Sequence, residues 1–299
     1  MRSPKNLYLA LCLLLLAAAA PAQGRDGFPL ALTDALGRRV AVDAKPARVV
    51  SLSPAVTEIL FAVGAGPQVA GVTEYCNYPP EAAAKAKVGG FSGITVNVEQ
   101  IALLKSDLVI LSGDMHQRII ELLDRLRIKS FAVEPRNFEE VYRTIGTIGR
   151  LTGNAPGAER VVAEMRAKLA QAGERRRGRG RPAVFWELSG DPLMSAGGNN
   201  FINEAITLAG GRNIFEDMAA QWPVVSQEQV MLRQPEWILA GDMAGRKIDP
   251  ALYARRPGWS RIPAVRGGNV ASVDPDTLYR YGPRLADAVL GISEIIFKD

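Results

Sequence analysis

Two stretches of this 299-residue chain repeat one pattern: NVEQIALLKSDLVIL at residues 97–111 and SQEQVMLRQPEWILA at residues 226–240. Each opens on a residue that can cap a helix, continues through Glu-Gln into apolar positions, and ends in an acidic residue followed by a strand-like apolar run. At an offset of 129 residues, Glu99 matches Glu228. A helix that leads into a buried strand is therefore predicted twice, which indicates two similar lobes.

A long helix is expected between the two repeats. From Ala158 to about Arg175 the sequence is rich in alanine, alternates in charge and has no glycine or proline before Gly173. At 1.5 Å per residue such a helix spans roughly 25 Å. We therefore predict an α/β fold of two similar lobes joined by one long α-helix, with a ligand cleft between the lobes. The predicted organisation is a signal peptide at 1–22, an N-terminal lobe at 23–154, a bridging helix at 155–177 and a C-terminal lobe at 178–299.

Short β-rich runs alternate with helical patterns on both sides of the bridging helix, which is typical of lobes with a largely parallel sheet. A hairpin is expected over 28–42, where two apolar runs flank the turn Asp34-Ala35-Leu36-Gly37. The expected strands are 48–52, 69–73, 107–111, 129–133, 183–188, 237–240 and 269–273. The expected helices outside the repeats and the bridge are 53–64, 116–127, 138–151 and 283–297.

The N-terminus has the features of a secretory signal peptide. Arg2 and Lys5 form a positive region before the apolar run 7–20, and Ala20-Pro21-Ala22 offers the small residues that a signal peptidase needs. The apolar run is shorter than the ~20 residues of a membrane-spanning helix. We predict export to the periplasm with cleavage after Ala22. Cys12 lies inside the apolar run, so the mature chain keeps one thiol, Cys76, without a partner for a disulfide.

Composition excludes several classes of protein. Lys and Arg number 36 and Asp and Glu number 31, and loss of two basic residues with the signal peptide leaves a net charge of about +3. This weak charge, with 7% aromatic residues, gives no basis for nucleic-acid binding. A single histidine and two cysteines cannot supply the usual ligands of a metal site or a disulfide framework. We therefore predict no metal site and no resident cofactor.

Sequence motifs for catalysis are also missing. The chain contains no phosphate-binding G-x-x-x-x-G-K-[ST], no G-x-S-x-G elbow and no H-E-x-x-H. Any nucleophile–histidine pair would have to use His116, which starts an expected amphipathic helix and which we interpret as an ordinary surface residue. Two lobes without a catalytic cluster favour a ligand-binding protein whose site lies in the cleft. An exported α/β hydrolase remains the alternative from a different class.

Five stretches then occur in an order that resembles the periplasmic substrate-binding proteins of ABC importers for cobalamin, ferric siderophores and haem. Besides the segment through KSDLVIL, they are RVVSLSPAVTEILFAVGAG (48–66), EYCNYPP (74–80), LAGGRNIF (208–215) and WPVVSQEQV (222–230). The resemblance covers nearly the whole mature chain, and the cobalamin binders are the nearest members. It implies two α/β lobes on one stiff helix, modest closure on ligand binding, and a cobalamin or related corrinoid carried as cargo without a resident cofactor.

The resemblance also implies a set of cleft residues. An aromatic face and a polar fringe suit a corrin, which is a broad apolar disc edged with amides. Two family tryptophans fall on Phe91 and Ser112 here, and a family phenylalanine falls on Met194. The predicted cleft is therefore less aromatic, which leaves room for another corrinoid or a different chelate. The ligand-binding residues implied by the match are Tyr75, Phe91, Met194, Trp222, Asp276 and Arg280.

The repeated glutamates, Glu99 and Glu228, have two interpretations. Each lies two residues past a capping residue, Asn97 or Ser226, where an acid favours the helix dipole and the following glutamine can complete a capping box. In the family that the chain resembles, matching glutamates on the two lobes meet arginines on the two permease subunits. We therefore predict docking of a monomeric receptor on an ABC importer permease dimer in the inner membrane.

Other ligands stay open within this family. A ferric-siderophore receptor and a haem receptor are the alternatives, and Tyr75 could serve as an axial haem ligand. A zinc or manganese receptor is disfavoured because one histidine cannot supply the imidazoles that such sites use.

Overall fold

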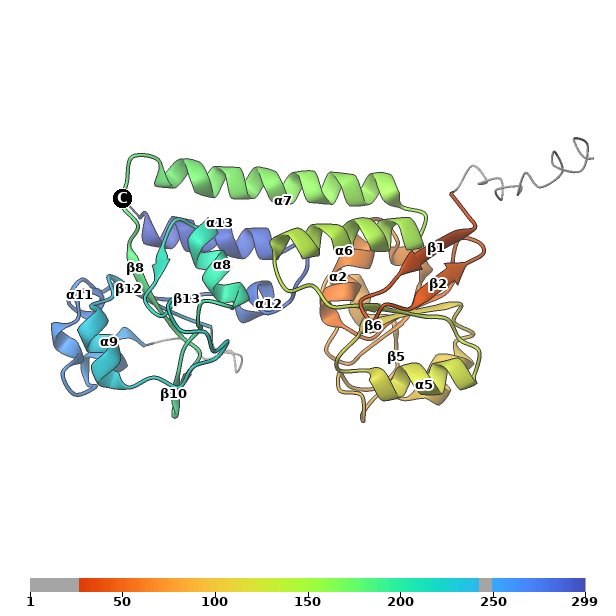
Figure 1. Cartoon of the computed structure of the whole chain (residues 1–299), viewed down its shortest axis with the longest axis horizontal. Coiled ribbons are helices and arrows are strands. Elements are labelled where there is room, and N and C mark those ends of the chain that lie inside the picture. The colour runs from red at the N-terminus through yellow and green to blue at the C-terminus, as the bar shows by residue number, and fades with distance from the viewer. Residues whose placement is uncertain (1–26, 242–248, 299) are drawn as a thin grey trace, which may run out of the picture.

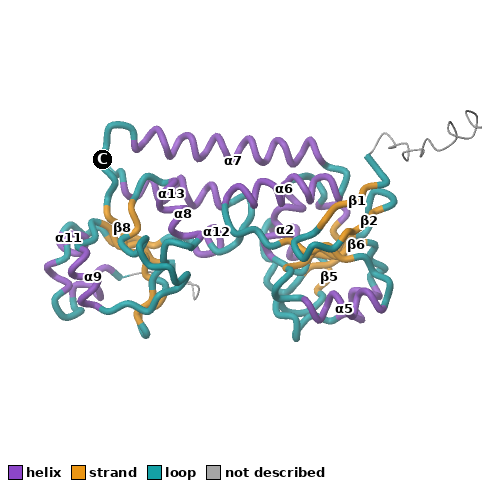
Figure 2. Tube along the Cα trace, viewed as in Figure 1, coloured by secondary structure: helices purple, strands orange, loops and turns teal. Residues whose placement is uncertain are grey.

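The computed structural model describes residues 27–241 and 249–298. The expected signal peptide and its cleavage site lie outside these ranges. Within them, no helix is both long enough and apolar enough to cross a bilayer. The described chain forms two lobes side by side beneath one long helix (Figure 1), and strands lie inside each lobe with helices around them (Figure 2).

The N-terminal lobe is built on a five-stranded sheet in the order β5-β4-β3-β6-β7, in which every neighbouring pair is parallel. Strand β6, between β3 and β7, begins with four buried apolar residues, as expected for a strand covered on both faces. The predicted hairpin is confirmed as two antiparallel strands beside this sheet. The elements are β1 (Leu30–Thr33), β2 (Arg39–Val42), β3 (Val49–Ser51), α2 (Pro54–Ala62), η2 (Gly66–Gln68), β4 (Val69–Val72), α3 (Pro80–Ala83), β5 (Ala86–Lys87), α4 (Val98–Leu103), β6 (Leu108–Ser112), α5 (Gln117–Arg125), β7 (Ser130–Val133) and α6 (Phe138–Leu151).

The C-terminal lobe has a four-stranded sheet in the order β11-β8-β12-β13, again with parallel neighbours. A short antiparallel pair, β9 with β10, follows β8. The elements are β8 (Ala183–Glu187), β9 (Ser189–Gly190), β10 (Leu193–Met194), α8 (Phe201–Leu208), β11 (Arg212–Asn213), α9 (Gln227–Arg233), β12 (Trp237–Ala240), α10 (Pro250–Ala254), η3 (Trp259–Arg261), α11 (Pro263–Arg266), β13 (Val270–Ser272), α12 (Pro275–Leu278) and α13 (Leu285–Ile296).

The internal repeat corresponds to equivalent places in the two sheets. Helix α4 precedes β6, which lies between β3 and β7, and helix α9 precedes β12, which lies between β8 and β13. The acidic residues that end the two helical segments have the same role. Asp107 accepts hydrogen bonds from the backbone N–H groups of Ala47 (2.8 Å) and Arg48, and Glu236 accepts one from Ala183 (3.0 Å). Each therefore fixes the start of its lobe's first parallel strand.

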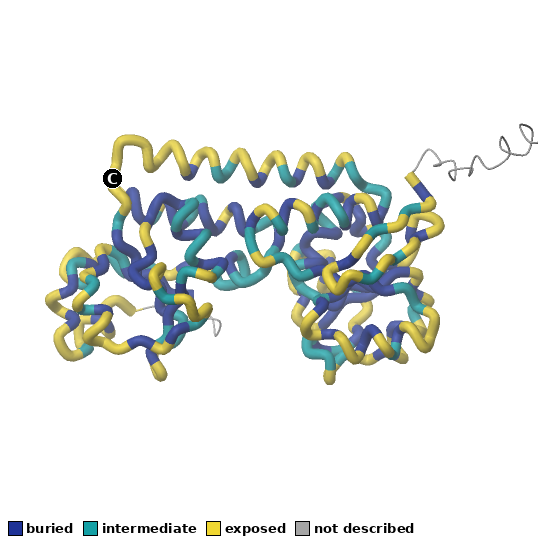
Figure 3. Tube along the Cα trace, in the orientation of Figure 1, coloured by how far each residue is buried: buried dark blue, intermediate teal, exposed yellow. Residues whose placement is uncertain are grey.

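The predicted bridging helix is confirmed as α7 (Ala155–Arg176), 22 residues and about 33 Å long. It packs on α6 of one lobe and on α13 of the other, while its outer face is exposed along its length (Figure 3). The helix approaches α2 closely at Gly157, where a Cβ atom would lie 2.1 Å from the carbonyl oxygen of Val63. Only glycine permits this contact, so the N-terminal end of α7 is fixed against the first lobe.

Contacts between the lobes reinforce the bridge. The ring of Phe138, at the start of α6, stacks on Phe201 of α8 with centroids 5.0 Å apart, and Phe201 stacks in turn on Tyr281 at 4.5 Å. The Glu204 carboxylate of α8 also accepts a hydrogen bond from the backbone N–H of Phe138. The lobes therefore contact each other below α7 as well as through it.

Ser53 occupies the N-cap of α2, where the expected helix 53–64 begins, although its side chain makes no capping hydrogen bond. One detail of the predicted helix starts is wrong. The capping box expected at both repeats forms only at α9, between Ser226 and Gln229. At α4, the Asn97 side chain accepts from the Gln100 N–H without the return bond.

The buried face of α7 provides a test of the bridge. Met165 is buried on the stripe that it shares with Ala158, Val161 and Ala172. Met165→Ala should lower the free energy of unfolding by about 2–5 kcal/mol, because it leaves a cavity where α7 packs. Urea unfolding followed by circular dichroism measures this change. Gln171→Ala, on the exposed face, is the control and should stay within about 0.5 kcal/mol; equal effects would contradict the packing role.

Candidate ligand-binding cleft

A cleft of about 790 Å³ opens between the lobes, within the range of roughly 300–1,000 Å³ typical of small-molecule sites. Its walls are loops and first helical turns that follow the carboxyl ends of β3, β4 and β5 in one sheet and of β13 in the other. Open parallel sheets place their ligands at this edge. The lining residues are Ser53, Pro54, Ala55, Glu74, Tyr75, Gly90, Phe91, Ser92, Thr95, Pro275, Asp276, Tyr279 and Arg280.

Two aromatic side chains stand on the wall that belongs to the N-terminal lobe. Tyr75 is 60% exposed although it is large and apolar over most of its surface, and Phe91 is half-buried. Both were predicted to bind the ligand, and both line the cleft. An exposed ring on a cleft wall can lie against a flat ligand. A ring packed inside the lobe could not.

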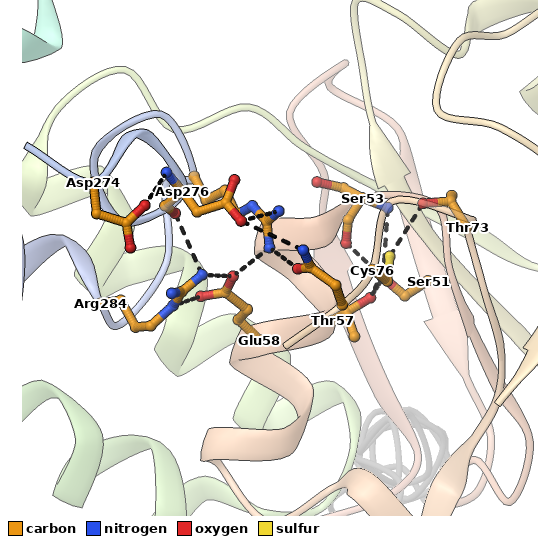
Figure 4. A network of polar contacts seen from close by, with 11 residues as sticks. Ser51, Ser53, Thr57, Glu58, Thr73, Cys76, Asp274, Asp276 and Arg284 are labelled. Atoms are coloured by element: carbon orange, nitrogen blue, oxygen red, sulfur yellow. Dashed lines mark hydrogen bonds and ion pairs between the residues drawn. The ribbon is translucent and has the colours of Figure 1, made fainter. Parts of the chain in front are cut away.

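The residue after Tyr75 anchors this wall. Cys76 is buried, and its Sγ lies 3.1 Å from the hydroxyl oxygens of both Thr57 and Thr73. Thr57 in turn donates to the Ser51 hydroxyl at 2.8 Å (Figure 4). The unpaired thiol predicted from the sequence is therefore a member of a buried polar cluster, and this cluster ties the Tyr75 loop to β3 and α2.

The opposite wall comes from α12 and the turn after it. Asp276 and Arg280, both predicted, form an ion pair at 2.7 Å and line the cleft. Tyr279, which the sequence analysis did not single out, lies between them and also lines the cleft. Burial raises the pKa of the Tyr279 hydroxyl to about 12. Tyr279 lies in the DTLYRYGPR segment between two predicted cleft residues, and this position could have identified it as a third.

Arg280 also joins the two lobes. Its guanidinium donates to Glu58 of α2 at 3.1 Å and to the side-chain oxygen of Asn77 at 2.6 Å. Arg284 donates twice to Glu58, at 2.7 and 2.9 Å (Figure 4). Its guanidinium carbon also lies 4.1 Å from the centre of the Tyr78 ring. The Glu58 side chain is only 2% exposed, so its charge is balanced by arginines of the other lobe. Sequence alone could not have predicted this cluster, because its members are more than 200 positions apart.

The structure places the other two predicted cleft residues beside the cleft and not among the residues that line it. Trp222 is half-buried with its ring centroid 6.4 Å from that of Tyr279. Met194, in β10, forms an antiparallel bridge with Val224, two residues after Trp222. Trp222 therefore contacts the cleft wall through Tyr279, and Met194 pairs with the segment that carries Trp222.

The interpretation of His116 as a surface residue is wrong. Its side chain is fully buried at the junction of β6 and α5, and it hydrogen-bonds to the backbone of Phe91. Among the described residues, no group of three or more His, Cys, Asp or Glu side chains could hold a metal ion.

The repeated glutamates are exposed in the first turns of α4 and α9. Hydrogen bonds from its own backbone and from Ser226 hold the pKa of Glu228 below its usual range, so this carboxylate is charged at neutral pH. One turn further along each helix stands an exposed leucine: Leu103 is 72% exposed and Leu232 is 84% exposed. The repeat therefore presents an acid and an apolar side chain on the surface of each lobe.

Comparison with known proteins agrees with this architecture. A model of the periplasmic binding protein family matches residues 49–277. The chain is 32% identical over 285 residues to the uncharacterized ABC transporter substrate-binding lipoprotein YvrC of Bacillus subtilis, covering 93% of this chain and 88% of that protein. It is 30% identical over 244 residues to the vitamin B12-binding protein of Photorhabdus laumondii, covering 81% and 85%.

Solved structures give the same result. The periplasmic vitamin B12-binding protein of Vibrio cholerae superposes with a TM-score of 0.70 at 28% identity, over 84% of this chain and 97% of that one. The periplasmic heme-binding protein RhuT of Roseiflexus sp. RS-1 superposes with a TM-score of 0.71 at 26% identity, over the same shares. The chain thus belongs to the periplasmic binding protein family, and the two-lobed α/β fold predicted from its sequence is confirmed.

Glu58 provides a test of the contact between the lobes. Glu58→Ala leaves two arginines without their shared carboxylate, and breaking a buried ion pair in this way costs about 3–5 kcal/mol of unfolding free energy. Urea unfolding of the ligand-free protein measures it. Glu159→Ala, an exposed acid on α7, is the control. A loss below about 1 kcal/mol at Glu58 would contradict the bridging role.

Proposed function

We propose that this protein is a periplasmic receptor that binds cobalamin or a related corrinoid and delivers it to an inner-membrane ABC importer, and that it is not an enzyme. The cleft carries the proposal, because it lies at the carboxyl edges of both sheets and joins two aromatic side chains to a polar wall. The similarity to vitamin B12-binding proteins over most of both chains supports the ligand class. We further propose that residues 1–22 direct export and are removed after Ala22, and that the mature protein is a monomer.

The chemistry of the cleft suits a corrinoid. Tyr75 and Phe91 offer ring faces to a broad apolar disc, while Ser92, Asp276 and Arg280 offer polar groups for amides at its edge. Trp222 contributes by contacting Tyr279 on the second wall, and Met194 by pairing with Val224 in the segment that follows Trp222. The lobes already contact each other through Glu58 and the Phe138–Phe201 stack, so little rearrangement is needed when the ligand enters.

Haem is the second candidate ligand. The exposed Tyr75 phenol on the cleft wall favours it, since tyrosine is an axial ligand of haem iron in some proteins, and the heme-binding protein RhuT shares this fold. A ferric siderophore is the third, because its receptors belong to the family that the chain resembles. Ligand binding without turnover separates all three from the hydrolase alternative.

Thermal melts identify the ligand. A ligand that binds only the folded protein adds about 2.7 kcal/mol of stability at 100 times its Kd, which raises Tm by about 5 °C or more for a chain of this size. Cyanocobalamin should produce this shift, while haemin and a ferric hydroxamate should not. A shift with haemin or the hydroxamate and none with cyanocobalamin would overturn the corrinoid assignment.

Two variants test whether the rise in Tm with cyanocobalamin comes from binding in the cleft. Tyr75→Ala should weaken cyanocobalamin binding about tenfold or more, because it removes an aromatic face from the ligand. Leu252→Ala truncates another exposed side chain, outside the residues that line the cleft, and should bind as the wild type does.

We propose that Glu99 and Glu228 are the contacts with the permease dimer. Their helices occupy equivalent places in the two lobes, α4 before β6 and α9 before β12. Helix α9 and helix α5, which contacts α4, lie on the side of the molecule opposite α7 (Figure 1). A receptor with two matching acids suits a permease with two matching basic sites, and such charge pairs fix orientation and speed encounter. The exposed Leu103 and Leu232 supply the apolar part of each contact.

Replacing both acids tests this docking proposal. Glu99→Ala with Glu228→Ala should leave cyanocobalamin affinity unchanged and shift Tm by no more than about 5 °C, since each acid contributes only a helix-dipole interaction to the fold. Uptake by the cognate importer should fall sharply, and receptor–permease association should lose much of its dependence on salt.

The matched control is Glu159→Ala with Glu164→Ala, which removes the same charge from the exposed face of α7. This control should transport at the wild-type rate. Wild-type uptake by the Glu99/Glu228 variant would mean that the two acids serve only their own helices.

A further inference from the structure

The chain's only histidine is built into the wall of the cleft. His116 is fully buried, and its Nε2 lies 2.8 Å from the carbonyl oxygen of Phe91, while its Nδ1 lies 3.2 Å from the backbone nitrogen of Ser112. The rings of His116 and Phe91 also meet edge to face, with centroids 6.2 Å apart. The imidazole thus joins the end of β6 to the loop that carries Phe91.

These two partners define the protonation state of the imidazole. The carbonyl oxygen of Phe91 can only accept, so Nε2 must carry a hydrogen, and the Ser112 N–H can only donate, so Nδ1 must be free of one. A second proton on Nδ1 would face the Ser112 N–H and break that hydrogen bond. Both hydrogen bonds can therefore form only with the neutral ring.

The loop from Gly89 to Asn97 is closed at its base by backbone hydrogen bonds, such as Gly90 N–H to the Thr95 carbonyl at 3.0 Å, and the tip of the loop is the part that His116 and the turn before α5 contact. Gly93 lies so close to the turn before α5 that a Cβ atom would be 2.7 Å from the carbonyl oxygen of Met115. Within the loop, Ser92 and Thr95 bond mainly to each other, with hydroxyl oxygens 2.9 Å apart. Three of the loop's residues besides Gly90 line the cleft: Phe91, Ser92 and Thr95. The shape of this wall consequently depends on how the loop is held against His116.

We propose that His116 is the positioning residue that holds the Phe91 loop in its ligand-binding shape, and that protonation of its ring releases this loop and weakens ligand binding. The effect on ligand affinity rests on the proposed function of the cleft. The effect on the loop depends only on the contacts of His116, so it can be measured without a ligand.

The surroundings of the ring set the direction of its titration. Burial lowers the pKa of His116 below the usual 6.5, although the hydrogen bond to the Phe91 carbonyl and the Glu134 carboxylate oppose this shift. Glu134 follows β7 and accepts hydrogen bonds from the Ser112 hydroxyl and the Asp114 N–H. Its negative charge acts on the His116 ring from β7, the neighbouring strand of the sheet. The loop 89–97 contributes no ionisable side chain.

The linked stability follows from this direction. Because the released ring takes up a proton near pH 6.5 and the buried ring only at lower pH, the buried state is fully favoured above about pH 6.5. Its advantage is lost as the pH falls from there through the lowered pKa. Acidification should therefore loosen the loop, and alkaline conditions should not.

A single histidine makes the test direct, provided that purification uses a tag without histidine. NMR of the ring nitrogens in the ligand-free protein should show the Nε2–H tautomer at about pH 7.5 and one titration below the usual range. The backbone amide signals of residues 89–97 should move with the same midpoint. Loop amides that do not follow the His116 titration would overturn the proposal.

Three variants separate positioning from general stability. His116→Gln can still donate from its side-chain amide to the Phe91 carbonyl, so it should bind cyanocobalamin within about threefold of the wild type at about pH 7.5. His116→Ala should bind about tenfold or more weakly and lose hydrogen-exchange protection in residues 89–97, with α6 and α7 unchanged. Ser293→Ala, which deletes another buried side-chain bond to a backbone carbonyl, is the control and should alter neither.

The dependence on pH completes the experiment. Wild-type affinity should fall as the pH is lowered from about 7.5 through the His116 midpoint measured by NMR, and His116→Gln should abolish most of that fall. A His116→Gln protein with the full wild-type pH dependence would overturn the proposal, as would unchanged loop exchange in a folded His116→Ala protein. If His116→Ala does not fold, the pH dependence of His116→Gln alone tests the proposal.

Absence of cyanocobalamin binding at every pH refutes the proposed ligand. The NMR measurements on the ligand-free loop then still test the role of His116.

Discussion

One continuous helix constrains the placement of everything else in this molecule. Helix α7 packs on α6 in the first lobe and on α13 in the second, and Gly157 fixes its start against α2. A helix of 22 residues is a stiff connection, unlike a pair of extended strands that could bend at a few dihedral angles. With Glu58 held by Arg280 and Arg284 on the inner side, the distance between the cleft walls is largely set before a ligand arrives.

Loops form much of the cleft walls. Buried polar groups fix the conformation of these loops, as apolar packing fixes the sheets. The Tyr75 loop is held by a thiol between two hydroxyls, and the Phe91 loop is held by a neutral imidazole. Buried polar groups of this kind are costly unless every partner is in place, so each favours one loop conformation strongly. Pre-organisation of this kind lowers the conformational cost of binding, because the aromatic faces are already presented.

The sequence predicts the scaffold well because the scaffold follows from local patterns. The apolar runs of β6 and β12, the alanine-rich bridge and the repeated Glu-Gln helices are each visible within about 20 residues. The failures concern contacts between distant positions. Glu58 looks like any acid on a helix until Arg280 and Arg284 are placed beside it, and His116 looks exposed until the Phe91 loop, 25 residues earlier, covers it.

The two lobes share a scaffold but not their cleft loops, and this difference separates two roles. What repeats at an offset of 129 residues is the α4–β6 and α9–β12 unit, with its exposed acid, its exposed leucine and its strand-fixing carboxylate. What does not repeat is the lining of the cleft, where one wall has Tyr75 and Phe91 and the other has Asp276, Tyr279 and Arg280. An asymmetric ligand needs no symmetry in its site, whereas a twofold partner requires it on the surface that meets it. This division is what the proposal requires, with the repeat on the surface proposed to meet a twofold permease and the divergence in the cleft proposed to hold a single small molecule.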